Sequence, residues 1–152
     1  MNPMKNYTSP EILTCLLRFF ASSPDEQAKQ LDEYYESCKI SESVPHLDDP
    51  LVELSEALWS YTNRFTVNRP ETDDLVSMFA NDEETALLLQ ELAALIELMW
   101  KTDTKELFEP NHFKSIEWRI LRRYSGDALL RCQRLAPGVQ LSLFDLMLEV
   151  AD

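Results

Sequence analysis

His46 is one of two histidines in the chain, and it stands beside two carboxylates, Asp48 and Asp49. Imidazole and carboxylate groups together bind divalent metal ions, so a metal-dependent enzyme that uses His46 is one alternative. The residues also have a structural explanation, because an aspartate placed just before Pro50 is typical of a helix start. We favour the structural interpretation.

His112 is the second histidine, and Glu109 precedes it at a spacing of three. A Glu-x-x-His pair is half of the ligand set of a di-iron bundle, which needs two such pairs on long helices and two further glutamates. Here the pair occurs once, and Pro110 interrupts it. We therefore interpret His112 as a residue at a helix start, and the enzyme that would use it stays the weaker alternative.

The three cysteines, Cys15, Cys38 and Cys132, are the candidate nucleophiles. Activation of a thiol needs a base or a cation beside it, and none of the three has a histidine close by in the sequence. Their spacing matches neither a zinc site nor a disulfide framework. We expect reduced thiols that pack as small apolar groups in a cytoplasmic, non-enzymatic protein without a cofactor.

Carboxylates dominate the ionised groups: 27 Asp and Glu stand against 14 Lys and Arg, for a formal net charge of −13. This charge repels phosphate backbones and anionic lipids, so neither nucleic acid nor a membrane is an expected partner. It favours rapid association with a basic protein, although acids on exposed helix faces also serve solubility. The candidate acidic patch comprises Asp48, Asp49, Glu53, Glu56, Asp73 and Asp74.

Basic residues are concentrated between residues 111 and 138, where six bases stand against two acids. Counted from Phe113 at about 100° per residue, Trp118 falls at the edge between core and solvent, and Arg122 points away from the core. A tryptophan beside arginines is typical of an interface hot spot. The candidate basic face comprises Trp118, Arg119, Arg122, Arg123, Arg131 and Arg134.

This basic face has two interpretations that the sequence leaves open. It would bind an acidic partner or a second copy of the chain, or its arginines would pair with acids of the same domain. Charge reversal in the acidic patch should abolish binding of a basic partner. Charge reversal in the basic face should instead abolish binding of an acidic partner or of a second copy.

Capping signals predict the helices that must position these groups. A Ser, Asp or Asn stands directly before a Pro or an acidic residue at positions 10, 24, 50, 74 and 82, which is the pattern of a helix start. Ser142 is the expected cap of a last apolar helix. The stretch 82–101 is apolar on most faces and is expected at the centre. A further helix is expected from His112 to Ser125, ended by Gly126.

The chain has only two glycines, which argues against a fold rich in β-hairpins. Its 152 residues fit one domain. The predicted fold is all-α: a single domain, residues 1–152, with six to eight helices around the apolar helix at 82–101.

The predicted function follows from fold class and charge together. We expect a non-enzymatic acidic module that binds a protein partner through surface charge, as an inhibitor, an immunity-type protein, a chaperone or an adaptor. The chain offers no uninterrupted apolar stretch long enough to span a bilayer, and its first residues are polar, so a cytoplasmic location is expected.

Overall fold

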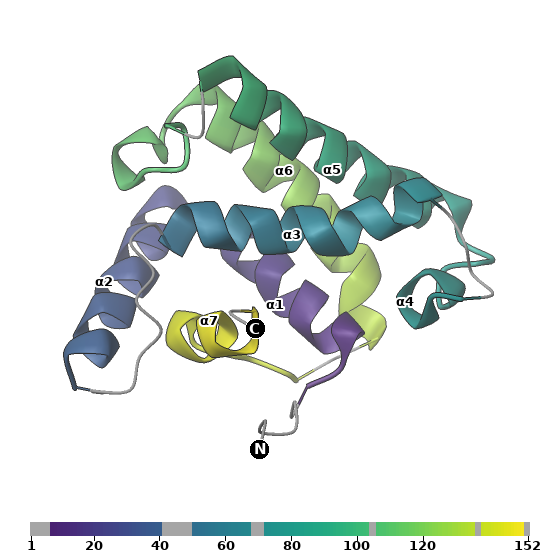
Figure 1. Cartoon of the computed structure of the whole chain (residues 1–152), viewed down its shortest axis with the longest axis horizontal. Helices are drawn as coiled ribbons and strands as arrows, with labels where there is room; N and C mark the ends of the chain where they lie inside the picture. Colours follow the sequence, from purple (N-terminus) through teal and green to yellow (C-terminus); the bar gives the residue numbers. More distant parts are fainter. Residues whose placement is uncertain (1–6, 41–49, 68–71, 104–105, 136–137, 151–152) are drawn as a thin grey trace.

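A computed structural model describes residues 7–40, 50–67, 72–103, 106–135 and 138–150 (Figure 1). Within these ranges the chain is helical and contains no strand, so the predicted all-α bundle is confirmed. The α-helices are α1 (Ser9–Ala21), α2 (Pro24–Ile40), α3 (Pro50–Val67), α4 (Asp74–Ser77), α5 (Glu83–Asp103), α6 (Ile116–Cys132) and α7 (Leu143–Val150). Two 3₁₀ turns, η1 (Pro110–His112) and η2 (Gln133–Leu135), flank α6.

Local capping bonds start several of these helices where the sequence predicts a start. Thr8 and Glu11 form a capping box on α1, with the Glu11 carboxylate accepting from the Thr8 N–H at 2.8 Å. The Ser23 hydroxyl accepts from Glu26 N–H at the start of α2, and Asp73 accepts from two N–H groups of α4. Each bond joins residues two or three positions apart, so the sequence alone is enough to predict it.

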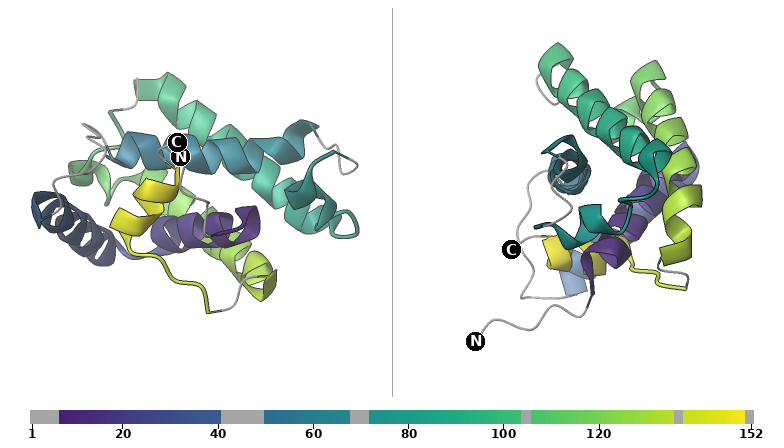
Figure 2. Two further views of the ribbon diagram at one scale, coloured as in Figure 1. Left: turned by 60° about the horizontal axis from the view of Figure 1, so that its bottom comes forward. Right: turned by 90° about the vertical axis from the view of Figure 1, so that its right-hand side faces the viewer.

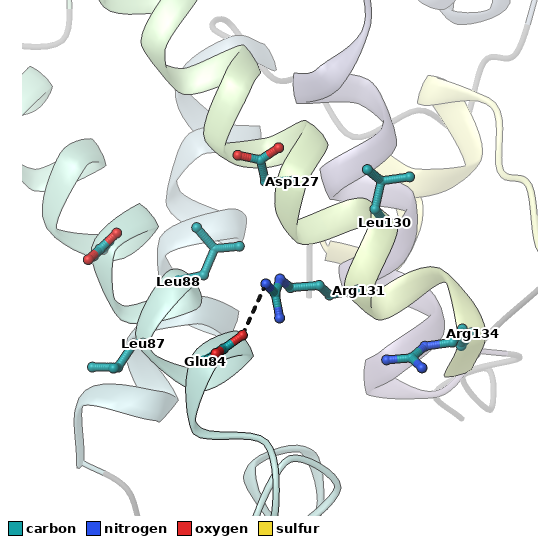
Figure 3. Close-up of a pocket in the computed structure, with 8 residues that line it drawn as sticks. Glu84, Leu87, Leu88, Asp127, Leu130, Arg131 and Arg134 are labelled. Carbon is teal, nitrogen blue, oxygen red and sulfur yellow. Dashed lines mark hydrogen bonds and ion pairs between the residues drawn. The ribbon is translucent and has the colours of Figure 1, made fainter.

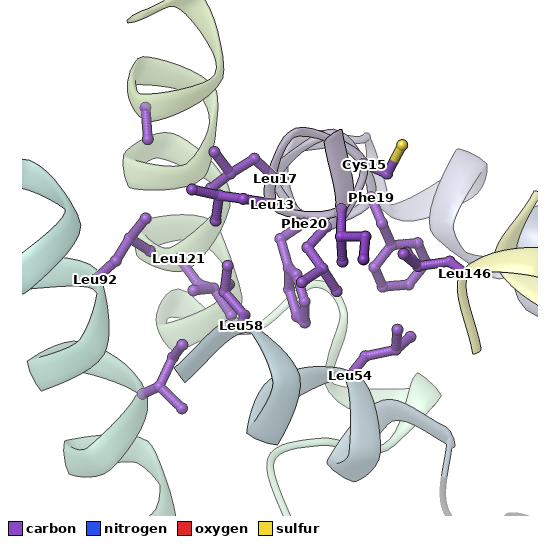
Figure 4. Close-up of a cluster of buried hydrophobic side chains, with 14 of the residues drawn as sticks. Leu13, Cys15, Leu17, Phe19, Phe20, Leu54, Leu58, Leu92, Leu121 and Leu146 are labelled. Carbon is purple, nitrogen blue, oxygen red and sulfur yellow. The ribbon is translucent and has the colours of Figure 1, made fainter. Parts of the chain in front are cut away.

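The most deeply buried helix is α1, whereas the sequence analysis expects the stretch 82–101 at the centre. Eight of its thirteen residues are buried, and the helix packs against α3, α6 and α7. In contrast, α5 packs against α3 and α6 and leaves Leu87 and Leu98 exposed. Figure 4 shows the α1 side chains filling the space between the other helices. Apolar residues all round α5 therefore do not make it the central helix.

The helix α6 differs from its predicted form at both ends. It begins at Ile116, where the Ser115 hydroxyl accepts from the Trp118 N–H, so Phe113 lies outside the helix. It also runs through Gly126 to Cys132, where a break was predicted. A Cβ at position 126 would lie 3.9 Å from the Cβ of Ala21, so this glycine sits where α6 packs closely on α1.

The helices α5 and α6 pack against each other, and each also packs on an inner helix, α3 and α1 respectively (Figure 2). The short helix α7 packs across α1, α2 and α3. This arrangement leaves hollows at the surface, two of which bear on function. One lies between α3 and α7, and the other lies between α5 and α6.

Candidate protein-binding site

A cleft of about 320 Å³ between α3 and α7 gathers three carboxylates. Glu53 and Glu56 come from α3, and Glu149 comes from α7. The remaining lining residues are Ala57, Ser60, Tyr61, Arg64 and Val150. The cleft thus combines an acidic wall with an aromatic ring and one arginine, and we call it the acidic cleft.

The heptad-like spacing of α3 turns these side chains outward. Glu53, Ser60 and Arg64 recur at intervals of seven and four, which places them on one face of a helix. The opposite face buries apolar side chains of the core, including Leu54, Leu58 and Phe65. On α7, burial of Leu146 and Met147 fixes the helix against the core and presents Glu149 to α3.

One carboxylate oxygen of the acidic cleft lacks a hydrogen-bond donor. Glu149 Oε2 is buried and has no partner among the residues that the structure describes. A buried polar atom left in this state costs free energy of about 1–3 kcal/mol. The Arg64 guanidinium, which also lines the cleft, makes a cation–π contact with Tyr61 at 4.7 Å from the ring centroid.

Burial and the nearby Glu149 carboxylate raise the pKa of Tyr61, although Arg64 lowers it. The Tyr61 hydroxyl therefore stays protonated and neutral at physiological pH. The charge of the acidic cleft is carried by its three glutamates and by Arg64, which leaves a net negative site.

The structure separates the predicted acidic patch into unrelated positions. Glu53 and Glu56 line the acidic cleft, whereas Asp73 caps α4 and Asp74 is exposed in the first turn of α4. Figure 1 places α4 beyond the opposite end of α3. Asp48, Asp49 and His46 lie outside the described residues.

Trp118 does not lie at the edge of the core, which corrects the sequence prediction. Its side chain is fully buried, stacked on Phe20 with ring centroids 5.7 Å apart, and its Nε1–H donates to Leu107 O at 2.6 Å. The prediction fails because Phe113 precedes the helix, so an angular count that starts there assigns the wrong face. Trp118 is therefore unavailable to a partner.

Arg122 also turns inward, contrary to the sequence prediction. Its guanidinium donates to Ser22 O at 2.7 Å, to Gln27 Oε1 at 2.9 Å and to Phe113 O at 2.9 Å. Burial and, to a smaller degree, Arg119 lower the pKa of Arg122. These bonds join α6 to the α1–α2 connection, so Arg122 is a structural residue.

The remaining arginines of the predicted basic face stay at the surface. Arg119, Arg123 and Arg134 are exposed, and Arg131 pairs with Glu84 across α5 and α6 at 3.3 Å. Figure 3 shows Arg131 and Arg134 beside the hollow between these helices. The structure thus divides the predicted basic face into the fully buried Trp118, the half-buried Arg122 and a group of arginines at the surface.

Sequence analysis missed three contributors to the acidic cleft: Tyr61, Arg64 and Glu149. The spacing of Arg64 from Glu53 on α3 is a signal that could have placed it on the same face. Glu149 gives no such signal, because only the packing of α7 on α3 brings it there.

Within the described part of the chain, no group of three or more His, Cys, Asp and Glu side chains is arranged to hold a metal ion. His112 lies in η1 and is partly exposed, and Glu109 precedes that turn without a side-chain capping bond. In the same part of the chain, none of the helices is both long and apolar enough to cross a membrane.

All three cysteines are free thiols, and two of them, Cys15 and Cys132, are buried. Burial, with a smaller contribution from the Asp82 carboxylate, raises the pKa of Cys132 from 9.0 to about 12. The unfolded chain therefore releases this proton near pH 9, whereas the folded chain keeps it until about pH 12. Folding stability that is present below pH 9 is lost as the pH rises through this interval.

Replacing Cys132 with alanine is expected to remove this part of the pH dependence, which amounts to about 1.4 kcal/mol per pH unit above pH 9. Urea unfolding of both proteins at pH 8, 9 and 10 measures the difference in slope. Cys38→Ala is the control, because Cys38 is only half-buried. Identical slopes for the native protein and Cys132→Ala would show that the thiol is accessible to water.

Comparison with known proteins adds no relative. No model of a known protein family matches the chain, and no significant match occurs among curated proteins or among solved structures.

Proposed function

We propose that this protein is a non-enzymatic, cytoplasmic module that binds a basic segment of a protein partner in the acidic cleft between α3 and α7. The observation that carries the proposal is the buried, unpartnered Glu149 Oε2 in a cleft that also contains Glu53 and Glu56. A guanidinium or ammonium group of a partner that enters the cleft pairs with the carboxylates that line it and offsets the cost of the unpartnered oxygen. Hydrogen bonds to ionised groups are stronger than neutral ones, so this contact favours a basic side chain.

The net charge of −13 supports the same partner class. It attracts a basic protein over a distance and raises the association rate, whereas it disfavours nucleic acid and anionic membranes. The long-range field steers the encounter, and the acidic cleft provides the specific contact. These two contributions can be separated experimentally, because the field depends on total charge and the contact depends on position.

The double variant Glu53→Gln/Glu149→Gln is expected to bind a fluorescein-labelled octa-arginine peptide about tenfold more weakly than the native protein, a loss of about 1.4 kcal/mol. The matched control is Asp32→Asn/Glu106→Gln, which removes two exposed carboxylates outside the cleft. Both variants have the same net charge. Fluorescence anisotropy at 150 mM salt measures the dissociation constants.

The control variant is expected to bind within about twofold of the native protein, because exposed charges distant from a contact are largely screened at this salt concentration. Equal weakening by both variants would mean that the peptide senses only total charge, and the proposed site would be wrong. The same three proteins, immobilised and exposed to extract of the native cell, should retain a basic protein in the native and control cases only.

A further inference from the structure

The outward sides of α5 and α6 carry large aliphatic side chains that the core does not use. On α6 the exposed fractions are 68% for Ile116, 40% for Ile120 and 73% for Leu130, and on α5 it is 55% for Leu87. At about 100° per residue the three α6 residues fall within about 80° of one another, opposite the buried side of α6. We call these four residues and the hollow between the helices the α5–α6 face.

The hollow is lined by both apolar and charged side chains. It has a volume of about 620 Å³, with Leu87, Leu88 and Leu130 among its lining residues (Figure 3). The charged lining residues are Glu84, Glu91 and Asp127 with Arg131 and Arg134. Surfaces that combine apolar side chains with arginine are common in protein–protein interfaces.

The two helices of this face carry opposite charge. On α5 the lining residues Glu84 and Glu91 give a charge of −2, whereas on the α6 side Arg131 and Arg134 with Asp127 give a net charge of +1. The arginines beyond Arg122 are at the surface or partly exposed. The face therefore presents an acidic strip next to a basic strip.

We propose that the α5–α6 face binds a second copy of this chain across a two-fold axis, with α6 of each copy on α5 of the other. A two-fold interface uses the same patch on both subunits, so the patch must complement itself. Rotation by 180° places the basic strip of one copy on the acidic strip of its partner, twice. The exposed leucine and isoleucine side chains of the two copies are then buried in the same interface.

Charge and size both favour a second copy at this place. Elsewhere two copies of a chain with net charge −13 repel each other, and of the stretches 1–110, 111–138 and 139–152 only the middle one is net positive. A 21-residue helix such as α5 is about 31 Å long, and two adjacent helices are about 20 Å wide. The face thus measures about 600 Å², close to the roughly 800 Å² per partner of a stable complex.

Sedimentation equilibrium at 10–100 µM, roughly the range that reveals a micromolar dimer, should give twice the 17.7 kDa mass of the chain. Leu130→Asp is expected to weaken the dimer about 100-fold, because each interface buries the new carboxylate twice. Ile40→Asp is the control: Ile40 is 83% exposed at the end of α2, away from this face, and its replacement should leave the dimer intact.

Charge-swapped variants test the arrangement of the two copies. Arg131→Glu/Arg134→Glu makes both strips acidic, and Glu84→Lys/Glu91→Lys makes both strips basic. Each variant alone is expected to be monomeric. Both variants lose the Arg131–Glu84 ion pair within the chain, so any effect of that loss on folding stability is common to both. An equimolar mixture should form a heterodimer, because every acidic strip then meets a basic one.

Three results would overturn the proposal. A native chain that stays monomeric at 100 µM excludes the second copy and leaves a different protein as the occupant of this face. A native dimer unaffected by Leu130→Asp uses another surface. Charge-swapped variants that stay apart when mixed exclude the paired acidic and basic strips. None of these variants alters the acidic cleft, so all of them should still bind octa-arginine. Failure of the native protein to bind octa-arginine would contradict the proposed function and would leave the proposed dimer untouched.

Discussion

Replacing Arg122 with methionine should lower the free energy of unfolding by about 3 kcal/mol, because several buried acceptors lose their donor at once. The Arg122 guanidinium donates to Ser22 O, Gln27 Oε1 and Phe113 O. Gln27 in turn donates from Nε2 to Phe19 O and Phe20 O at the end of α1. Arg122 and Gln27 thus satisfy the carbonyls that a helix C-terminus leaves unpaired.

The position of this cation is also electrostatically favourable. The last turn of α1 carries the negative end of the helix dipole, and Arg122 contacts it through Ser22 O and Gln27. Lysine at position 122 keeps the charge but lacks the planar fork that reaches three acceptors. We therefore expect Arg122→Lys to recover only about 1 kcal/mol of the loss.

Urea unfolding followed by circular dichroism measures these changes. Lys114→Met is the control, because Lys114 is exposed just before α6 and is not part of the α5–α6 face, so a change within about 0.5 kcal/mol is expected. The pair Arg122→Met and Gln27→Met should also be non-additive, by about 1 kcal/mol or more, since each side chain needs the other. Additive losses, or a loss under 1 kcal/mol for Arg122→Met, would contradict the shared role.

Truncation of Trp118 to alanine should cost about 3–5 kcal/mol, the range for removing a large aromatic side chain from a packed core. Trp118 is fully buried and contacts three aromatic rings, Phe20, Phe108 and Phe113, with centroids between 4.9 and 5.7 Å away. These rings belong to α1 and to the segment before α6. Removal of Trp118 therefore loosens several elements at once.

Phenylalanine at position 118 isolates the hydrogen bond from the packing. It keeps an aromatic ring but leaves Leu107 O without the Nε1–H donor that it has at 2.6 Å. A buried carbonyl without a donor costs about 1–3 kcal/mol. Trp118→Phe should therefore lie between the native protein and Trp118→Ala in urea unfolding.

Ile40→Ala is the control for Trp118, because the Ile40 side chain is 83% exposed at the end of α2, away from the α5–α6 face. We expect a change within about 0.5 kcal/mol. If Trp118→Ala were as mild as this control, the indole would be at the surface, as counting from Phe113 suggests, and the structure of α6 would be wrong there.

The helix starts were predictable because capping is a local interaction. Ser23 with Glu26, Asp82 with Thr85 and Ser142 with Asp145 are each bonded over three positions. The same locality explains the errors in α6. Its start at Ser115 and its passage through Gly126 depend on competition between a local stop signal and packing against α1.

The candidate site was only partly predictable. Glu53 and Glu56 could be assigned to one acidic surface from their spacing, whereas Glu149 could not be assigned to it, because α7 reaches α3 only in the folded chain. The arginine-rich stretch was identified by composition. Its division into the half-buried, inward-bonded Arg122 and the arginines at the surface depends on how α6 is rotated against α1.

By itself, the sequence determined the helical class, most of the helix starts and the overall negative charge, because these depend on residues a few positions apart or on simple composition. Only the tertiary structure decided which side of each helix is buried. The Arg122–Ser22 bond joins residues 100 positions apart, and Trp118 stacks on Phe20. Such contacts depend on how whole helices pack. The periodicity of α6 does not determine them, because several rotations of the helix about its axis would bury similar numbers of apolar side chains.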